Sequence, residues 1–385
     1  MRRIIHLSLI LMVLTVSSNF AVSRRLPRFQ PRVPIGDVAV SVAVADLNGD
    51  GALDIVTANS TSRSDDISIR LGNGDGTFQA EQLLTAGDIV VSVAVADLNA
   101  DHIPDIVSAN FGSDDVSVLL GTGDASFQPQ QRFSVGNDPV SLDVADLNAD
   151  GIPDLITANP GSGDISVLLG KGDGTFQAER RFSTERDPIS MAVADLNGDG
   201  ALDVVTANTN FISSDVSILT GNGDGTFRLM RRFAAGNGPV SVAVADLNND
   251  HIPDIITTNF LRGNISVLQG RGNGAFQAQR QFDVGDGPVS VAVADFNGDG
   301  NPDLVTANFL SSDISVLLGK GNGTFQDQNR FDTGDGPVSI AVADLNADRA
   351  LDVVTANTNF TSSDISVLLG KGDGSFEPFR RLSRE

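Results

Sequence analysis

The sequence lacks cysteine, tryptophan and tyrosine altogether, and it contains only three histidines in 385 residues. Because there is no cysteine, disulfides, thiolate metal sites and cysteine nucleophiles are all excluded. The absence of Trp and Tyr removes the aromatic platforms against which sugar rings usually stack. Outside the first 23 residues only His102 and His251 remain, so few histidines could serve as the base of a Ser-His-Asp triad. We therefore expect a protein that is not an enzyme.

Long hydrophobic runs are also lacking. The apolar stretch Ile4–Val16 has about 13 residues, whereas a membrane-spanning helix needs roughly 20. It follows Arg2 and Arg3 and precedes the small-x-small pattern Ala21-Val22-Ser23, which is typical of a signal peptidase site. We predict a signal peptide at 1–23 and a single mature domain at 24–385. The protein is then secreted, with the periplasm or the cell surface as alternatives, and no part of it inserts into a membrane.

The formal net charge of −23 is concentrated in a few places. Seven recurring loops hold 21 of the 49 acidic residues, so the rest of the chain has 28 acidic against 26 basic residues. The chain therefore has neither an acidic tail nor a uniformly acidic surface. It also lacks the basic face that binding to phosphate groups requires, so no nucleic-acid partner is expected.

The Asp that opens each loop recurs every 49 to 51 residues. The unit that contains Asp146 shows four runs rich in Val, Ile, Leu and Phe, at Val140–Ala145, Asp154–Ala158, Ile165–Leu169 and Phe176–Phe182, separated by Gly, Asn, Asp and Pro. Seven four-stranded units of this length predict an all-β fold, a seven-bladed β-propeller with four antiparallel strands per blade. The alternative is a β-solenoid, whose coils are typically shorter and whose strands run parallel.

The sequence does not decide which terminal strand closes such a ring. Phe29–Val33 resembles the start of a fourth strand, as at Phe127–Gln131, which gives eight candidates for seven outer strands. Either this N-terminal copy or Phe376–Leu382 completes the last blade.

Each recurring loop reads D-x-N-x-D-x-x-x-D, as in Asp46–Asp54. Side-chain oxygens at positions 1, 3, 5 and 9 and the backbone carbonyl of position 7 can surround a hard cation, and Ca²⁺ fits better than Mg²⁺, which demands stricter octahedral geometry. The alternative is that Asp and Asn only form tight Asx-turns. Up to seven Ca²⁺ ions are thus predicted. The expected ligands are, loop by loop, Asp46, Asn48, Asp50, Ala52 and Asp54; Asp97, Asn99, Asp101, Ile103 and Asp105; Asp146, Asn148, Asp150, Ile152 and Asp154; Asp195, Asn197, Asp199, Ala201 and Asp203; Asp246, Asn248, Asp250, Ile252 and Asp254; Asp295, Asn297, Asp299, Asn301 and Asp303; and Asp344, Asn346, Asp348, Ala350 and Asp352.

Position 6 of these loops divides them into two groups. A turn at this position usually needs a positive φ, which glycine adopts at little cost. Four loops have glycine there, whereas the other three have His102, His251 and Arg349. We predict weaker Ca²⁺ binding at those three loops, and the weakest where Arg349 adds a positive charge beside the ion.

The units 291–303 and 317–325 resemble FG-GAP (VCBS-type) repeats, which build the propeller of integrin α-subunits and occur in many bacterial secreted proteins. The resemblance covers nearly the whole mature chain, and it implies a Ca²⁺-binding propeller whose loop Asp and Asn side chains hold the ions. Family members serve in adhesion, in carbohydrate binding or as platforms in lyases and lipases. We expect a monomeric extracellular interaction or adhesion module with an unidentified protein or glycan partner. The alternative is a calcium-dependent carbohydrate-binding protein or the platform of a polysaccharide lyase or hydrolase.

All length variation between units falls in the connection from the second to the third strand, on the face opposite the Asp-rich loops. Apolar side chains on these variable loops predict either a partner-binding patch or caps over the blades. The side chains are Phe111, Phe211, Ile212, Phe260, Leu261, Phe309, Leu310 and Phe360.

Overall fold

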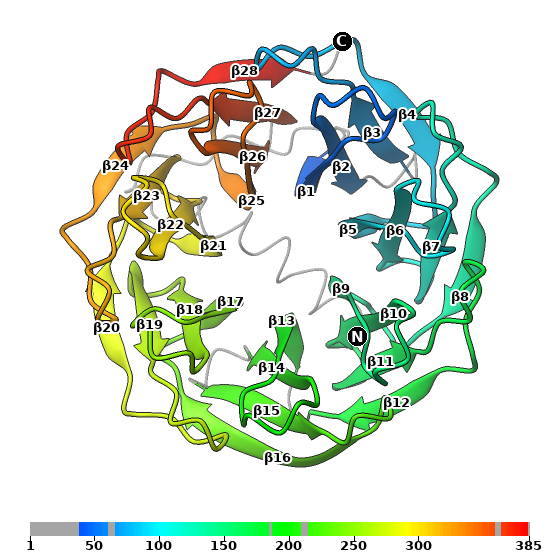
Figure 1. Ribbon diagram of the computed structural model, residues 1–385, viewed down its shortest axis with the longest axis horizontal. Helices are drawn as coiled ribbons and strands as arrows, with labels where there is room; N and C mark the ends of the chain where they lie inside the picture. Colours follow the sequence, from blue (N-terminus) through cyan, green and yellow to red (C-terminus); the bar gives the residue numbers. More distant parts are fainter. Residues whose placement is uncertain (1–37, 61–65, 185–186, 209–214, 359–362, 384–385) are drawn as a thin grey trace, which may run out of the picture.

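A computed structural model describes residues 38–60, 66–184, 187–208, 215–358 and 363–383. Seven four-stranded antiparallel sheets form a ring around a central opening (Figure 1). Within every sheet the spatial order of the strands is their order in the chain. The predicted all-β, seven-bladed propeller is therefore confirmed. The predicted signal peptide and the segment Phe29–Val33 lie outside the described residues.

The first strand of each blade lines the central opening and the second strand lies behind it (Figure 1). The first strands are β1 (Val38–Ala45), β5 (Val90–Ala96), β9 (Ser141–Ala145), β13 (Pro188–Ala194), β17 (Pro239–Ala245), β21 (Pro288–Ala294) and β25 (Pro337–Ala343). The second strands are β2 (Asp54–Ser60), β6 (Asp105–Asn110), β10 (Asp154–Asn159), β14 (Asp203–Asn208), β18 (Asp254–Asn259), β22 (Asp303–Asn308) and β26 (Asp352–Thr358).

The third strand is the last one buried on both faces, and the fourth lies on the perimeter (Figure 1). The third strands are β3 (Asp66–Arg70), β7 (Asp115–Leu119), β11 (Asp164–Leu168), β15 (Asp215–Gly221), β19 (Asn264–Leu268), β23 (Asp313–Leu317) and β27 (Ser363–Leu368). The fourth strands are β4 (Gln82–Thr85), β8 (Gln131–Ser134), β12 (Arg180–Ser183), β16 (Phe227–Ala234), β20 (Arg280–Asp283), β24 (Asn329–Asp332) and β28 (Arg380–Ser383).

The core lies between adjacent blades, where the apolar faces of their second and third strands meet. Pairs of phenylalanine side chains pack together in the outer part of these interfaces. Phe133 of β8 meets Phe176 of the next blade edge to face, with ring centroids 5.1 Å apart, and similar pairs recur around the ring. Near the axis, small first-strand residues let neighbouring blades come close, since the Val93 backbone N–H donates to Ser41 Oγ of the preceding blade at 3.3 Å.

In the described part of the chain, blades one and seven meet through side-chain packing and a hydrogen bond. The outer strand of blade seven is the C-terminal β28, which pairs with β27. Val42 and Ile55 of blade one share an apolar cluster with Val354 and Ile365 of blade seven. The Ala39 backbone N–H also donates to Ser363 Oγ at 2.7 Å, so the two ends of the ring are held by a direct hydrogen bond.

The predicted start of the fourth strand is wrong for blade three. The expected strand was Phe176–Phe182, whereas β12 begins only at Arg180 and Phe176 forms an isolated bridge with Gly170. The same bridge between glycine and phenylalanine precedes a short fourth strand in every blade except blade four. There β16 runs unbroken from Phe227.

Within the described segments, no helix is long and apolar enough to cross a lipid bilayer.

Candidate metal-binding loops

The seven Asp-rich loops connect the first strand of each blade to the second. In blade one the loop begins at Asp46, directly after β1, and ends at Asp54, the first residue of β2. The Gly-rich turn that joins the third and fourth strands lies on the same rim, because the Gly72 backbone N–H donates to Asp54 Oδ1 at 2.8 Å. The second-to-third-strand loops that the structure describes, in blades two, three, five and six, therefore occupy the opposite face, as the up-and-down connectivity predicts.

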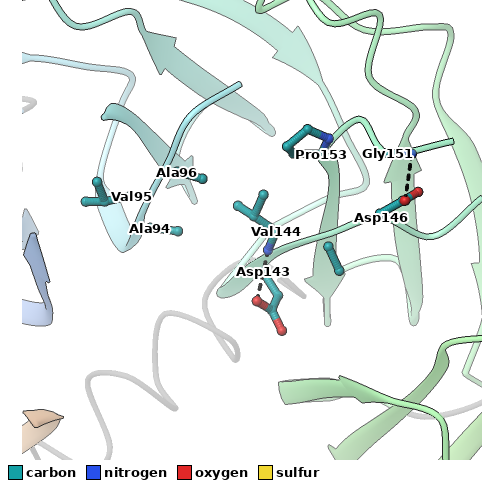
Figure 2. Close-up of a pocket in the computed structure, with 9 residues that line it drawn as sticks. Ala94, Val95, Ala96, Asp143, Val144, Asp146, Gly151 and Pro153 are labelled. Carbon is teal, nitrogen blue, oxygen red and sulfur yellow. Dashed lines mark hydrogen bonds between the residues drawn. The ribbon is translucent and has the colours of Figure 1, made fainter. Parts of the chain in front are cut away.

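The first Asp of each loop accepts hydrogen bonds from the backbone of its own loop. Asp46 Oδ1 accepts from the Asp50 N–H at 3.2 Å and Asp46 Oδ2 from the Gly51 N–H at 2.9 Å. The bond from position 6 recurs in the other six loops at 2.7 to 2.8 Å. Figure 2 shows this bond between Gly151 and Asp146. The loop thus curls around the first carboxylate.

The third and fifth positions support one another. Asn48 Oδ1 accepts from the Asp50 N–H at 3.0 Å, and Asp50 Oδ1 accepts from the Ala52 N–H at 2.8 Å. The Asn48 side-chain amide also donates to Asp50 Oδ2 at 2.9 Å. In blade four this amide turns inward, and Asn197 Nδ2 lies 3.3 Å from Asp203 Oδ2. The Asn side chain therefore has two arrangements within the same backbone turn.

The ninth Asp is the buried member of the loop. The Asp254 side chain is fully shielded from solvent, and its two oxygens accept from the Leu247 N–H at 3.2 Å and from the Gly270 N–H at 2.8 Å. The equivalent pair of bonds is present in all seven blades. This carboxylate joins the start of its loop to the Gly-rich turn.

Burial raises the pKa of every ninth-position carboxyl, and the two Asp residues earlier in the same loop raise it further by repulsion. The pKa reaches about 6 at Asp254 and at Asp352. The backbone hydrogen bonds act in the opposite direction and favour the charged form. The three carboxylates of one loop therefore lie close enough to feel each other's charge.

Position 6 has a positive φ in every loop. The φ angle is 85° at Gly51, where no side chain is present to cause strain. It is 65° at His102, 62° at His251 and 73° at Arg349. All seven loops thus share one backbone conformation at position 6, and the three loops without glycine adopt it at a cost of about 1 kcal/mol or more.

The donor set of each loop suits a hard cation, because it consists of carboxylate, amide and carbonyl oxygens. The carboxylates are nevertheless engaged with backbone N–H groups. In the described part of the chain, no group of three or more His, Asp or Glu side chains is arranged so that it could hold a metal ion. A bound cation thus requires the side chains to turn toward a common point. A carboxylate has free lone pairs for this even when each oxygen accepts one hydrogen bond.

A cavity of about 400 Å³ lies beside the third loop, between β5 and β9 (Figure 2). Asp143, Val144 and Asp146 line it together with Ala94 and Pro153. Figure 2 shows the Asp143 and Val144 side chains on opposite sides of β9.

Asp143 is the only acidic residue at its position, which is Ala in the first strand of the other six blades. Among the described residues, only the Val144 N–H donates a hydrogen bond to its carboxylate, at 2.9 Å, and burial raises the pKa of this carboxyl.

The apolar residues of the variable loops divide into two groups. Phe111 and Phe309 are buried, as caps are, and Phe260 packs partly against the same cluster as Phe309. Leu261 and Leu310 are exposed, with 57% and 41% of their surface accessible. Phe211, Ile212 and Phe360 lie outside the described residues.

The structure thus defines a class, a seven-bladed propeller with one Asp-rich loop per blade on one rim. The model of the FG-GAP-like repeat matches the chain over most of this ring, and the chain belongs to that family. The matches cover residues 46–108, 97–157, 146–206, 207–257, 253–306 and 295–355. No curated protein matches the chain in sequence.

Several solved structures share the fold. One is a lectin from Agrocybe aegerita, described as recognising non-reducing terminal N-acetylglucosamine, with 21% identity and a TM-score of 0.56; the match covers 90% of this chain and 94% of the lectin. Another is BBS1N in complex with ARL6DN, with 13% identity, a TM-score of 0.62 and coverage of 90% and 97%. A third is a putative 6-phosphogluconolactonase from Bacteroides uniformis, with 13% identity, a TM-score of 0.61 and coverage of 86% and 97%. At these identities the likeness concerns the fold alone.

Proposed function

We propose that the protein is a secreted, calcium-stabilised propeller that serves as an extracellular interaction module and has no catalytic activity of its own. The proposal is supported above all by the position of the ninth Asp in each Asp-rich loop. In each blade it joins the Asp-rich loop to the Gly-rich turn, and it is buried beside two further carboxylates. A cation in the loop would neutralise this cluster, so that binding of the ion and folding of the rim become linked.

The side chains of positions 1, 3, 5 and 9 and the carbonyl of position 7 would hold the ion. Ca²⁺ supplies positive charge and a flexible coordination sphere, which suits seven loops of similar backbone and different side chains at position 6. The chain itself supplies the curled backbone, which hydrogen bonds to the first Asp hold in place.

Metal analysis and thermal unfolding test this proposal. Purified protein dialysed against millimolar CaCl₂ should contain several equivalents of Ca²⁺, and its melting temperature should fall strongly when EDTA is added. Millimolar MgCl₂ should restore little of the loss. An identical melting temperature in EDTA and in CaCl₂, together with metal-free protein, would contradict the proposal.

The partner is an extracellular protein or a glycan, and the variable-loop face is the surface to test first. It carries the exposed Leu261 and Leu310, whereas the Phe residues beside them are largely used as caps. A Leu261→Ser/Leu310→Ser variant should lose binding, and Leu83→Ser is the matched control because Leu83 is equally exposed on the perimeter strand β4. Equal binding by both variants would exclude this face.

A glycan array is the first screen, because a lectin shares the fold over nearly the whole chain. Calcium-dependent capture of a defined sugar would make the protein a carbohydrate-binding module. Turnover of a polysaccharide on the same panel would instead favour the platform of a lyase or hydrolase.

A further inference from the structure

The outer strand of blade four differs from the other six. The fourth strands are edge strands, because each is paired on one side only, and six of them are four residues long. β16 is eight residues long and follows the perimeter (Figure 1). Short edges are a common protection against unwanted strand pairing, and β16 lacks this protection.

The residue three positions after the bridging Phe differs between blades. In four blades the third residue after the bridging Phe is Gln or Glu, which accepts a hydrogen bond from a third-strand Ser, as Gln130 does from Ser117 at 2.7 Å. In these four blades the fourth strand begins only after this contact. Blade four has Met230 at this position and stays paired with β15, whereas blade seven has Phe379 and still has a short fourth strand, so this residue alone does not set the strand length.

The pairing of β16 extends over most of its length. Met230–Ala234 pairs with Asp215–Leu219, and beyond a β-bulge Phe227 and Arg228 pair with Gly221 and Thr220. The other fourth strands have four paired residues each. β16 thus presents the longest run of backbone N–H and C=O groups along the perimeter.

Three arginines on β16 are exposed and have no ion-pair partner among the described residues: Arg228, Arg231 and Arg232. Arg232 takes the position that Arg132 and Arg181 hold in their own blades, where each forms an ion pair with the Asp that begins the third strand, at 2.6 and 2.5 Å. Blades six and seven have the same pair. In a chain with a net charge of −23, β16 therefore carries three positive charges that no described carboxylate neutralises.

We propose that β16 binds an extended acidic peptide segment of a partner protein, which pairs with the β16 backbone as a fifth strand of blade four. Backbone pairing supplies the affinity of such strand addition, and side chains supply the selectivity. Arg guanidinium groups match carboxylates in a two-pronged geometry. Their mutual repulsion disfavours pairing of β16 with the β16 of a second copy, so the occupant is a different, acidic chain.

Calorimetric titration with a defined probe tests the proposal, in CaCl₂ throughout. The probe is an acetylated peptide of alternating Glu and Val, as long as β16. We expect saturable binding to the wild type and a loss of at least about tenfold in the Arg228→Gln/Arg231→Gln/Arg232→Gln variant, which corresponds to about 1.4 kcal/mol. All three side chains are exposed, so the fold should be retained.

Two controls separate strand addition from simple charge attraction. An Arg132→Gln/Arg330→Gln variant removes arginines from short outer strands and should bind the probe like the wild type. The same probe with N-methyl groups on alternate residues keeps its charge but cannot pair along one edge, and it should bind at least about tenfold more weakly. Equal binding of the methylated probe, equal binding to the triple variant, or no binding at millimolar probe would overturn the proposal.

Neither result depends on whether the Asp-rich loops bind Ca²⁺. The outcome of this test is therefore independent of whether the proposed function is correct.

Discussion

Asp254 Oδ1 accepts the Gly270 backbone N–H at 2.8 Å, so one buried carboxylate joins the Asp-rich loop of blade five to the turn between its third and fourth strands. Its second oxygen accepts the Leu247 N–H. This carboxylate has a structural role even without metal, because both donors are buried and have no solvent to replace it.

We predict that Asp254→Ala lowers the free energy of unfolding by about 3 kcal/mol in EDTA, since two buried N–H groups lose their acceptor. Asp250→Ala is the matched control. Asp250 is exposed and accepts only the Ile252 N–H at 2.9 Å within its own turn, so its removal should cost less than about 1 kcal/mol in EDTA. Urea unfolding of both variants measures the difference, and equal losses would contradict the structural role.

The pH dependence of stability in EDTA follows from the same carboxyls. Their pKa is raised in the folded state, to about 6 at Asp254 and Asp352, from an ordinary value of 3.8. The folded state therefore holds these protons more tightly than the unfolded state does, and stability is lost as the pH rises from 3.8 through about 6.

Below this window the trend reverses, because hydrogen bonds from Ser126 and Thr122 lower the pKa of Asp124 to about 2. Melting temperatures in EDTA should thus be highest near pH 4 to 5 and fall toward pH 7. With CaCl₂ the decline toward pH 7 should be much smaller, because the cation favours the charged carboxylates. A melting temperature in EDTA that rises steadily from pH 4 to pH 7 would refute the assignment.

The sequence predicts the ring and the rim because both depend on a local pattern that recurs seven times. The loop of Asp46–Asp54 and the strands beside it need only their own residues to be recognised. The role of the ninth Asp as a link to Gly72 is different, since the two residues are brought together by the pairing of whole strands. Loop spacing alone suggests a ligand there and does not reveal the acceptor for a distant backbone.

The start of the fourth strand was mispredicted for a related reason. Apolar spacing indicates a strand from Phe176, whereas in the structure Glu179 accepts a hydrogen bond from Ser166 at 2.6 Å and β12 begins only after it, at Arg180. A polar side chain that reaches inward cannot be distinguished from an exposed one by alternation alone. Met230 in blade four and Phe379 in blade seven both stand where the other five blades have Gln or Glu, so this position alone does not identify the blade with the long outer strand.

Position 6 of the loops gives a prediction about backbone strain. Arg349 has a φ of 73°, which strains a non-glycine residue. Arg349→Gly should therefore raise the free energy of unfolding by about 0.5 to 1 kcal/mol in EDTA. The relief of strain is partly offset because glycine has greater freedom in the unfolded chain. Gly300→Ala is the reverse experiment. Apart from the neighbouring residues, no atom lies within 4 Å of the added Cβ. A decrease of about 1 kcal/mol in the free energy of unfolding would therefore come from the positive φ and not from a steric clash. Destabilisation by Arg349→Gly would show that the arginine makes a favourable contact.

Asp143 gives the last prediction. Burial raises the pKa of this carboxyl, and among the residues that the structure describes only the Val144 N–H donates to it, so ionisation opposes folding. Asp143→Ala introduces the residue that the other six blades have, and it should raise the free energy of unfolding by about 1 kcal/mol at neutral pH. The gain should shrink as the pH falls and the wild-type carboxyl takes up its proton. Ala94→Asp, at the equivalent position of blade two, should lower stability by a similar amount. If Asp143→Ala instead destabilised the protein at neutral pH, the carboxylate would have a favourable partner, and removal of bound cations by dialysis against EDTA would show whether that partner is an ion.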